Sequence, residues 1–151
     1  MNDCTVCLDI INDDNRLLVY ENENFFISHG PLNSYILGYL KIQPKRHIEN
    51  WTDFTDQELA ELPFIIKSLE FILKEELNID RVYSVSINEA VRHIHIHIIP
   101  RAFEENIKGL PLIEQATQQH PKSDTKVTAE EITHFIKLVN KKLTNIYSKN
   151  E

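Results

Sequence analysis

The sequence predicts an α+β domain in which an antiparallel five-stranded sheet packs against two main helices. Two patterns indicate this class. Several short segments alternate apolar and polar residues with the period of two that is typical of strands, and two longer segments repeat apolar residues every three or four positions, as amphipathic helices do. No internal repeat or linker interrupts the 151 residues, so we expect a single domain over residues 1–151.

The strand predictions rest on this alternation and on the turn residues between the segments. Pro100 is expected to end the last strand, because proline lacks the N–H that strand pairing needs. Residues 89–91 alone separate the last two segments, which are therefore predicted to form an antiparallel hairpin. The five predicted strands cover residues 17–20, 25–28, 36–42, 82–88 and 92–99.

Two capping-box patterns, beginning at Thr55 and Thr128, predict where the main helices start. The first helix is expected over residues 56–77, and Pro63 within it should kink or split it. The second carries an apolar stripe from Ile132 to Ile146. Residues 102–126 show few periodic signals and are predicted to be a loop.

Charge and hydropathy limit the classes of partner. The formal net charge of −7 argues against nucleic-acid binding, which relies on a basic surface. Residues 38–47 and 90–101 are neutral to basic, so a small phosphorylated ligand is allowed, although no glycine-rich phosphate loop is present. No apolar run reaches the length of a membrane helix and the start does not resemble a signal peptide, so we expect a cytoplasmic protein without membrane contact.

Three of the seven histidines stand at alternate positions, His93, His95 and His97. Residues two apart on a strand are separated by roughly 7 Å, so the three imidazoles are expected to form a row on one sheet surface. One neutral imidazole could attack a phosphorus atom while its neighbours hold the charged oxygens and the leaving group. The isolated histidines are expected at the surface; these are His29, His120 and His134.

Residues 93–101, His-Ile-His-Ile-His-Ile-Ile-Pro-Arg, resemble the signature of the histidine triad (HIT) family. Residues 38–47, Gly-Tyr-Leu-Lys-Ile-Gln-Pro-Lys-Arg-His, resemble the family's glycine-led strand, Pro-Lys turn and fourth histidine. The Cys4-x-x-Cys7 pair is similar to one found in many bacterial-type members. The resemblance covers about residues 4–101 and implies a HIT-like fold, a homodimer whose two sheets continue into one, and a small nucleotide as substrate.

The same resemblance implies residue roles. His95 matches the nucleophile, which attacks the α-phosphorus of a nucleotide and forms a nucleotidyl-histidine that water hydrolyses. His97 matches the histidine that contacts the phosphate and the leaving group. The implied substrates are a dinucleoside polyphosphate, such as diadenosine tetraphosphate, or a nucleoside phosphoramidate. In members with the cysteine pair, zinc is held at the positions that match Cys4, Cys7, His47 and His93.

Two thiolates and two imidazoles satisfy tetrahedral zinc with no open position, so such a metal would be structural. The alternative is that the two cysteines belong to a frayed terminus without metal. The sequence also departs from the family pattern, since the connection before the triad is shorter than the family's Gly-x-x-Ala-Gly-Gln loop. Asn88 and Arg92 are the residues of this connection that could replace the phosphate contacts of that loop.

Three functions remain open at this point. The first is a nucleotide hydrolase or transferase of the triad family. The second is a zinc metalloenzyme whose metal is held by the histidine row itself, since His-x-His on a strand is also a catalytic zinc arrangement. The third is a nucleotide-binding or interaction protein without turnover. Removal of metal should abolish the activity of the second and mainly lower the stability of the first.

Overall fold

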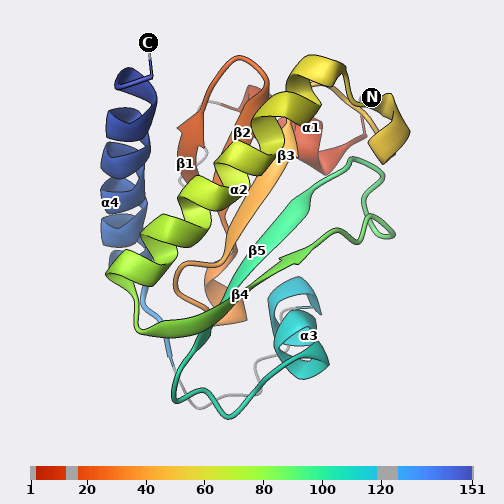
Figure 1. The fold of residues 1–151 in the computed structure, drawn as a ribbon. Coiled ribbons are helices and arrows are strands. Elements are labelled where there is room, and N and C mark those ends of the chain that lie inside the picture. Colours follow the sequence, from red (N-terminus) through yellow and green to blue (C-terminus); the bar gives the residue numbers. More distant parts are fainter. Residues whose placement is uncertain (1–2, 13–16, 119–125, 151) are drawn as a thin grey trace.

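A computed structural model describes residues 3–12, 17–118 and 126–150 of the chain. Its described part contains an antiparallel five-stranded sheet with the strand order β1-β2-β3-β5-β4, as the sequence predicts (Figure 1). The strands are β1 (Leu18–Glu21), β2 (Phe25–His29), β3 (Leu40–Pro44), β4 (Ile79–Val85) and β5 (Ile96–Ala102). The α-helices are α1 (Thr5–Ile11), α2 (Asp56–Glu76), α3 (Leu110–Gln118) and α4 (Ala129–Ser148).

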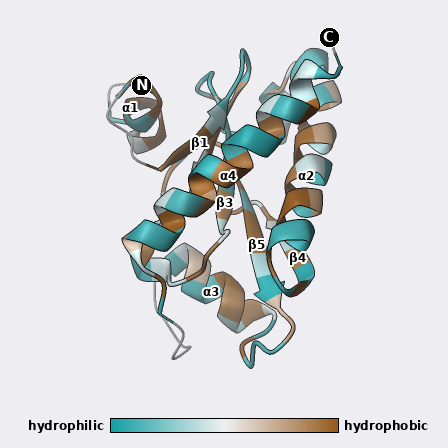
Figure 2. Ribbon diagram, turned by 90° about the vertical axis from the view of Figure 1, so that its left-hand side faces the viewer, coloured by the Kyte–Doolittle hydropathy of each residue, from teal (hydrophilic) through white to brown (hydrophobic). Residues whose placement is uncertain are grey.

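Strand β5, which lies between β3 and β4, separates two cores. Ile96 and Ile98 belong to the larger core, which the apolar stripes of α2 and α4 complete on one face of the sheet. His97 and Ile99 point to the opposite face because side chains alternate along a strand, and Ile99 packs there against α3. Figure 2 shows α1 and α2 on opposite sides of the sheet. The side chains of Tyr39, which precedes β3, and of Lys41 and Gln43 within β3 lie on this second face.

Both predicted capping boxes are present. The Thr55 hydroxyl accepts a hydrogen bond from the Glu58 N–H, and the Glu58 carboxylate accepts one from the Thr55 N–H at 2.8 Å. Thr128 and Glu131 form the same pair at the start of α4. A cap of this kind stabilises a helix by about 1 kcal/mol.

Of the two predicted effects of Pro63, a kink or a split, the split does not occur, since α2 is one helix of 21 residues with Pro63 inside it. An interior proline costs one hydrogen bond and a steric adjustment. The helix nevertheless continues because the apolar residues on both sides of the proline are buried against the same face of the sheet. These residues are Leu62, Ile65, Leu69, Ile72 and Leu73.

Several strand bounds differ from the predictions; among them, β4 covers Ile79–Val85 rather than residues 82–88. β3 begins at Leu40 rather than at residue 36, because the chain turns through Tyr35 and Gly38, both with positive φ. β5 does not end before Pro100 but continues through it to Ala102. The pairing of β5 with β3 ends at Ile98, so Pro100 has a strand neighbour on the β4 side alone, where it opposes Val82. A proline is tolerated in a strand at such a position.

The antiparallel pairing of the last two strands is confirmed, but their connection covers residues 86–95 rather than 89–91. Two helices were not predicted. α1 has seven residues and α3 has nine, lengths at which a helix in isolation is marginal and tertiary packing decides. Residues 110–118 were predicted as loop, yet Leu112 and Ala116, four apart, are buried in the second core. None of the described helices is long and apolar enough to cross a membrane.

His29 is fully buried, so its predicted surface position is wrong. Its Nδ1 lies 2.7 Å from the Gly30 carbonyl and its Nε2 accepts a hydrogen bond from the Gly38 N–H at 2.9 Å. Burial lowers the pKa of His29 to about 4, so the ring is neutral. Its two contacts hold the backbone of the β2–β3 connection in place. His134 is exposed as expected, and His120 lies outside the described residues.

Candidate functional site

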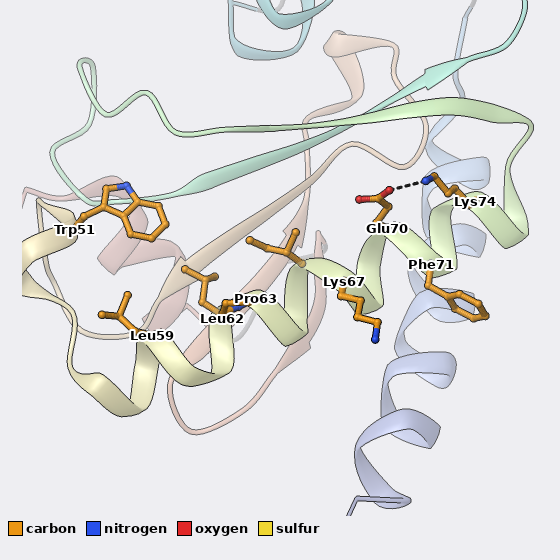
Figure 3. A pocket seen from close by; sticks show the side chains of 9 residues that line it. Trp51, Leu59, Leu62, Pro63, Lys67, Glu70, Phe71 and Lys74 are labelled. Carbon is orange, nitrogen blue, oxygen red and sulfur yellow. Dashed lines mark hydrogen bonds and ion pairs between the residues drawn. The ribbon is translucent and has the colours of Figure 1, made fainter.

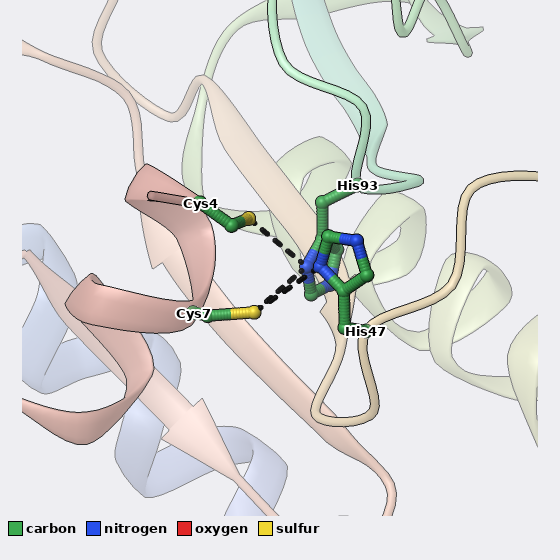
Figure 4. A group of neighbouring side chains, drawn as sticks. All are labelled: Cys4, Cys7, His47 and His93. Atoms are coloured by element: carbon green, nitrogen blue, oxygen red, sulfur yellow. Dashed lines mark hydrogen bonds between the residues drawn. The ribbon is translucent and has the colours of Figure 1, made fainter. Parts of the chain in front are cut away.

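Two cysteines and two histidines from three parts of the chain meet at the start of α1 (Figure 4). The Cys7 Sγ lies 3.3 Å from the His47 Nδ1 and 3.5 Å from the His93 Nδ1. The Cys4 Sγ lies 3.6 Å from the His93 Nδ1, and one ligand atom from each of the four side chains falls within 4.8 Å of the others. We call this group the Cys–His cluster.

The geometry and donor set of the Cys–His cluster fit a zinc ion. Zinc bonds of 2.0–2.3 Å in a tetrahedron separate neighbouring ligand atoms by about 3.5 Å, close to the contacts found here. The His93 Nε2 lies 2.8 Å from the Pro44 carbonyl, which turns the Nδ1 toward the cysteines, as outer-shell partners of metal ligands do. Burial and then the Cys4 thiol raise the pKa of Cys7, so a bound cation would be needed to hold the Cys7 sulfur as a thiolate.

The expectation of three imidazoles in a row is wrong. His93 lies in the irregular connection before β5, where strand alternation does not apply, and its Nδ1 faces the Cys–His cluster. His95 and His97 remain together, with ring centroids 4.8 Å apart. In the described ranges, the Cys–His cluster is the one group of three or more cysteine, histidine or acidic side chains close enough to share a metal. Residues 3–12, 17–118 and 126–150 therefore supply no third cysteine, histidine or acidic ligand beside His95 and His97.

His95 is oriented by two hydrogen bonds within its own connection. Its Nδ1 lies 2.7 Å from the His93 carbonyl, and because a carbonyl only accepts, the Nδ1 carries the proton. Its backbone N–H donates to the Asn88 Oδ1 at 3.1 Å. Burial lowers the pKa of His95, which favours the neutral ring. The Nε2 lone pair of His95 is therefore available to an electrophile.

His97 pairs with Tyr39 on the second face of the sheet. The Tyr39 hydroxyl lies 2.6 Å from the His97 Nδ1, and both side chains are buried, with exposed fractions of 2% and 6%. Burial lowers the pKa of His97 to about 3 and raises that of Tyr39 well above its usual value. The pair is therefore a neutral imidazole and a protonated phenol at physiological pH.

A pocket of about 290 Å³ opens in front of these histidines and contains His95 and His97 in its lining. One wall comes from α1, another from β3 and another from the end of α3. Sequence analysis did not single out the β3 residues on this wall, although the alternation of residues 38–44 could have identified them. The side chains that line the pocket from α1 are Thr5, Val6 and Asp9. Those from β3 and the residue before it are Tyr39, Lys41 and Gln43.

The two residues predicted for substrate binding lie at the edge of this site. Asn88 contacts the backbone of His95, as described above. Arg92 has a side chain that is 80% exposed, and its guanidinium lies 3.6 Å from the Glu49 carboxylate. Neither side chain lines the pocket in front of His95.

Comparisons with known proteins agree with this architecture. The HIT domain model matches residues 13–104. A HIT-like protein of Methanocaldococcus jannaschii is 31% identical over 105 residues, which are 65% of this chain and 78% of that protein. The bis(5'-adenosyl)-triphosphatase of Dictyostelium discoideum is 26% identical over 126 residues, 75% of this chain and 83% of that protein. The nitrilase and fragile histidine triad fusion protein of Caenorhabditis elegans is 26% identical over 107 residues, 64% of this chain but 24% of that protein.

Solved structures show the same fold. A zinc-bound histidine triad family protein from Mycobacterium smegmatis superposes with a TM-score of 0.70 at 19% identity, covering 96% of this chain and 98% of that one. A histidine triad nucleotide-binding protein from Sulfolobus tokodaii superposes with a TM-score of 0.69 at 23% identity, covering 95% and 93%. From the domain match, the relatives and the fold, we conclude that the chain belongs to the HIT domain family.

Proposed function

We propose that the protein is a nucleotide hydrolase or transferase that cleaves the α-phosphate linkage of a dinucleoside polyphosphate or a nucleoside phosphoramidate. The observation that carries the proposal is the orientation of His95, whose Nδ1–H donates to the His93 carbonyl and leaves the Nε2 unprotonated. The similarity to a bis(5'-adenosyl)-triphosphatase supports the substrate class.

In the proposed reaction the His95 Nε2 attacks the α-phosphorus, and the bond from phosphorus to the leaving group breaks. The hydrogen bond from Nδ1–H to the His93 carbonyl stabilises the positive charge that develops on the ring. His97, whose ring centroid lies 4.8 Å from that of His95, contacts the phosphate and the leaving group in this proposal. Water then breaks the phosphorus–nitrogen bond, which releases a nucleoside monophosphate and restores His95. Another nucleophile in place of water would make the same reaction a transfer.

We also propose that the Cys–His cluster holds a structural zinc ion. Four ligands leave no position for a substrate, so the metal would take no part in the chemistry. Its effect would be to hold α1 against the connection before β5 and the end of β3, from which His93 and His47 come. Since α1 also lines the pocket in front of His95, zinc would stabilise one wall of the site. The zinc-bound neighbour from Mycobacterium smegmatis supports this proposal.

A homodimer is the third part of the proposal. A groove of about 580 Å³ runs along the outer side of α2, with mostly apolar side chains pointing into it (Figure 3). Phe71 is 60% exposed and Trp51 is 49% exposed, which is unusual for side chains of this size. β4 is an edge strand of the sheet, so a second copy could extend the sheet there and cover the groove of α2.

The decisive experiment is turnover of diadenosine tetraphosphate and of adenosine 5'-phosphoramidate by the wild type, His95→Ala and His134→Ala. His134 lies exposed on α4 and serves as the matched control. We expect a nucleotidyl adduct on His95 in acid-quenched intact mass spectra of the wild type and of the control, and neither adduct nor turnover with His95→Ala. Retention of turnover by His95→Ala, with loss on chelation, would move the assignment to a metalloenzyme. Absence of turnover of either substrate would favour a binding protein.

A further inference from the structure

A lysine stands next to the two histidines on the second face of the sheet. Lys41 of β3 is the register partner of His97 of β5, so the two side chains point to the same face. The Cβ atoms of directly opposed residues lie about 4.5–5.5 Å apart. Lys41 also lines the same pocket as His95 and His97. The ammonium group of Lys41 is thus attached close to the atoms that would react.

Lys41 differs from the other cations around the site in having no ion-pair partner. Within the described residues its ammonium has no hydrogen bond and no carboxylate within 4 Å. The nearby cations are all paired: Lys45 with Glu21 at 2.7 Å, Arg46 with Glu58 at 2.8 Å and Arg92 with Glu49 at 3.6 Å. Burial lowers the pKa of Lys41, and the charge of Asp9 on α1 opposes this effect. A half-buried cation without a partner is costly and is stabilised when an anion binds beside it.

The remaining groups of the pocket make Lys41 its source of positive charge. His97 is held neutral by burial, and the Nδ1–H of His95 is occupied by the His93 carbonyl, so His95 turns its unprotonated Nε2 to the pocket. The carboxylates that line the pocket are Asp9 and Glu89, both exposed to solvent, where their repulsion of an anion is screened. An entering phosphate would therefore meet one half-buried cation and two exposed carboxylates.

We propose that the Lys41 ammonium binds the non-bridging phosphoryl oxygens of the group that lies in front of His95. The assignment of that group to a nucleotide rests on the proposed function, whereas the anion site rests on the position of Lys41. A lysine at this point offsets the negative charge of the phosphate before the attack and the added charge on its oxygens during it. It acts together with the neutral histidines and adds the charge that they do not supply.

The test compares pyrophosphate, AMP and adenosine as ligands of the wild type, Lys41→Met, Lys41→Arg and Lys45→Met, by calorimetry or NMR titration. Pyrophosphate probes the anion site without a nucleoside, and adenosine probes the nucleoside without an anion. Loss of a charge-assisted contact should weaken the binding of pyrophosphate and AMP to Lys41→Met about tenfold or more, while adenosine binding stays as in the wild type. Lys41→Arg should restore most of the affinity, and Lys45→Met should bind as the wild type does.

Equal binding of pyrophosphate to the wild type and Lys41→Met, or no binding to the folded wild type, would overturn the anion site. Lys41→Gln repeats the measurement with a shorter neutral side chain, so the result does not depend on one variant folding. The proposed function fails in a different way. If the anion site is correct and the proposed function is wrong, pyrophosphate binding depends on Lys41 but neither nucleotide substrate is turned over.

Discussion

Tyr39→Phe and Tyr147→Phe remove the same atom from two tyrosines whose hydroxyls are buried, and the first variant alone is expected to lower the stability of the fold. The Tyr39 hydroxyl contacts the His97 Nδ1 at 2.6 Å. The Tyr147 hydroxyl is buried, and no other described residue hydrogen-bonds to it. Tyr147 lies on α4 and stacks on Tyr20 with ring centroids 5.3 Å apart, far from the chemistry proposed for His95.

The expected sizes follow from these contacts. Tyr39→Phe keeps the ring in the second core but leaves the Nδ1 of His97 buried without its partner, which costs about 1–3 kcal/mol. For a domain of 151 residues this lowers the melting temperature by about 2–10 °C. If the hydrogen bond also orients His97 in the transition state, kcat should fall about fivefold to a hundredfold. Tyr147→Phe removes an unsatisfied hydroxyl, so its free energy of unfolding should stay constant or rise by about 1 kcal/mol.

Thermal unfolding and steady-state kinetics on both variants check these expectations, with Tyr83→Phe as a third case. The Tyr83 hydroxyl accepts a hydrogen bond from the Gly109 N–H at 2.9 Å at an exposed position, so its loss should cost less than that of Tyr39. Equal effects of Tyr39→Phe and Tyr147→Phe on stability would refute the reasoning. Unchanged kcat in Tyr39→Phe would show that this hydroxyl does not orient His97 for the reaction.

Three further predictions concern the metal, the pH dependence and the dimer. Cys7→Ala should remove bound zinc and lower the melting temperature together, measured by elemental analysis and calorimetry; zinc-free wild type purified without chelator would contradict this. The hydrogen bonds from Arg46 lower the pKa of Glu58 to about 2, so this pair stabilises the fold fully above about pH 4.5 and loses its effect as the pH falls toward 2. Because Arg46 is half exposed, Glu58→Gln should cost about 1–2 kcal/mol at pH 7 and much less at pH 3 in urea unfolding, and an equal cost at both pH values would contradict the assignment. Phe71→Asp should shift the mass in solution scattering from dimer to monomer without unfolding the chain, and a wild type that is monomeric at micromolar concentration would exclude the dimer.

The sequence by itself determined the features that depend on neighbours along the chain. The capping boxes at Thr55 and Thr128 join residues three apart, so the starts of α2 and α4 were predicted to the residue. The strands were predicted because the alternation of apolar and polar residues indicates which face of a strand is buried. The signature around His95 and the cysteine spacing indicated the family. The Cys–His cluster was predicted through that resemblance, since no local pattern brings its four residues together.

Tertiary structure alone decided the features that depend on contacts between distant segments. The short helix α3 is stabilised by packing against β5, and α1 buries Val6; the sequences of these two helices do not reveal either contact. His93 and His95 both precede β5, which begins at Ile96, so strand alternation does not fix the directions of their rings. The His93 ring faces Cys7, whereas the His95 ring lies beside His97. The register of β3 with β5 sets Lys41 beside His97, and a shift of one residue would have turned this lysine to the other face. Cross-strand register is a non-local property, so the sequence pattern of each strand predicted its faces but not its partners.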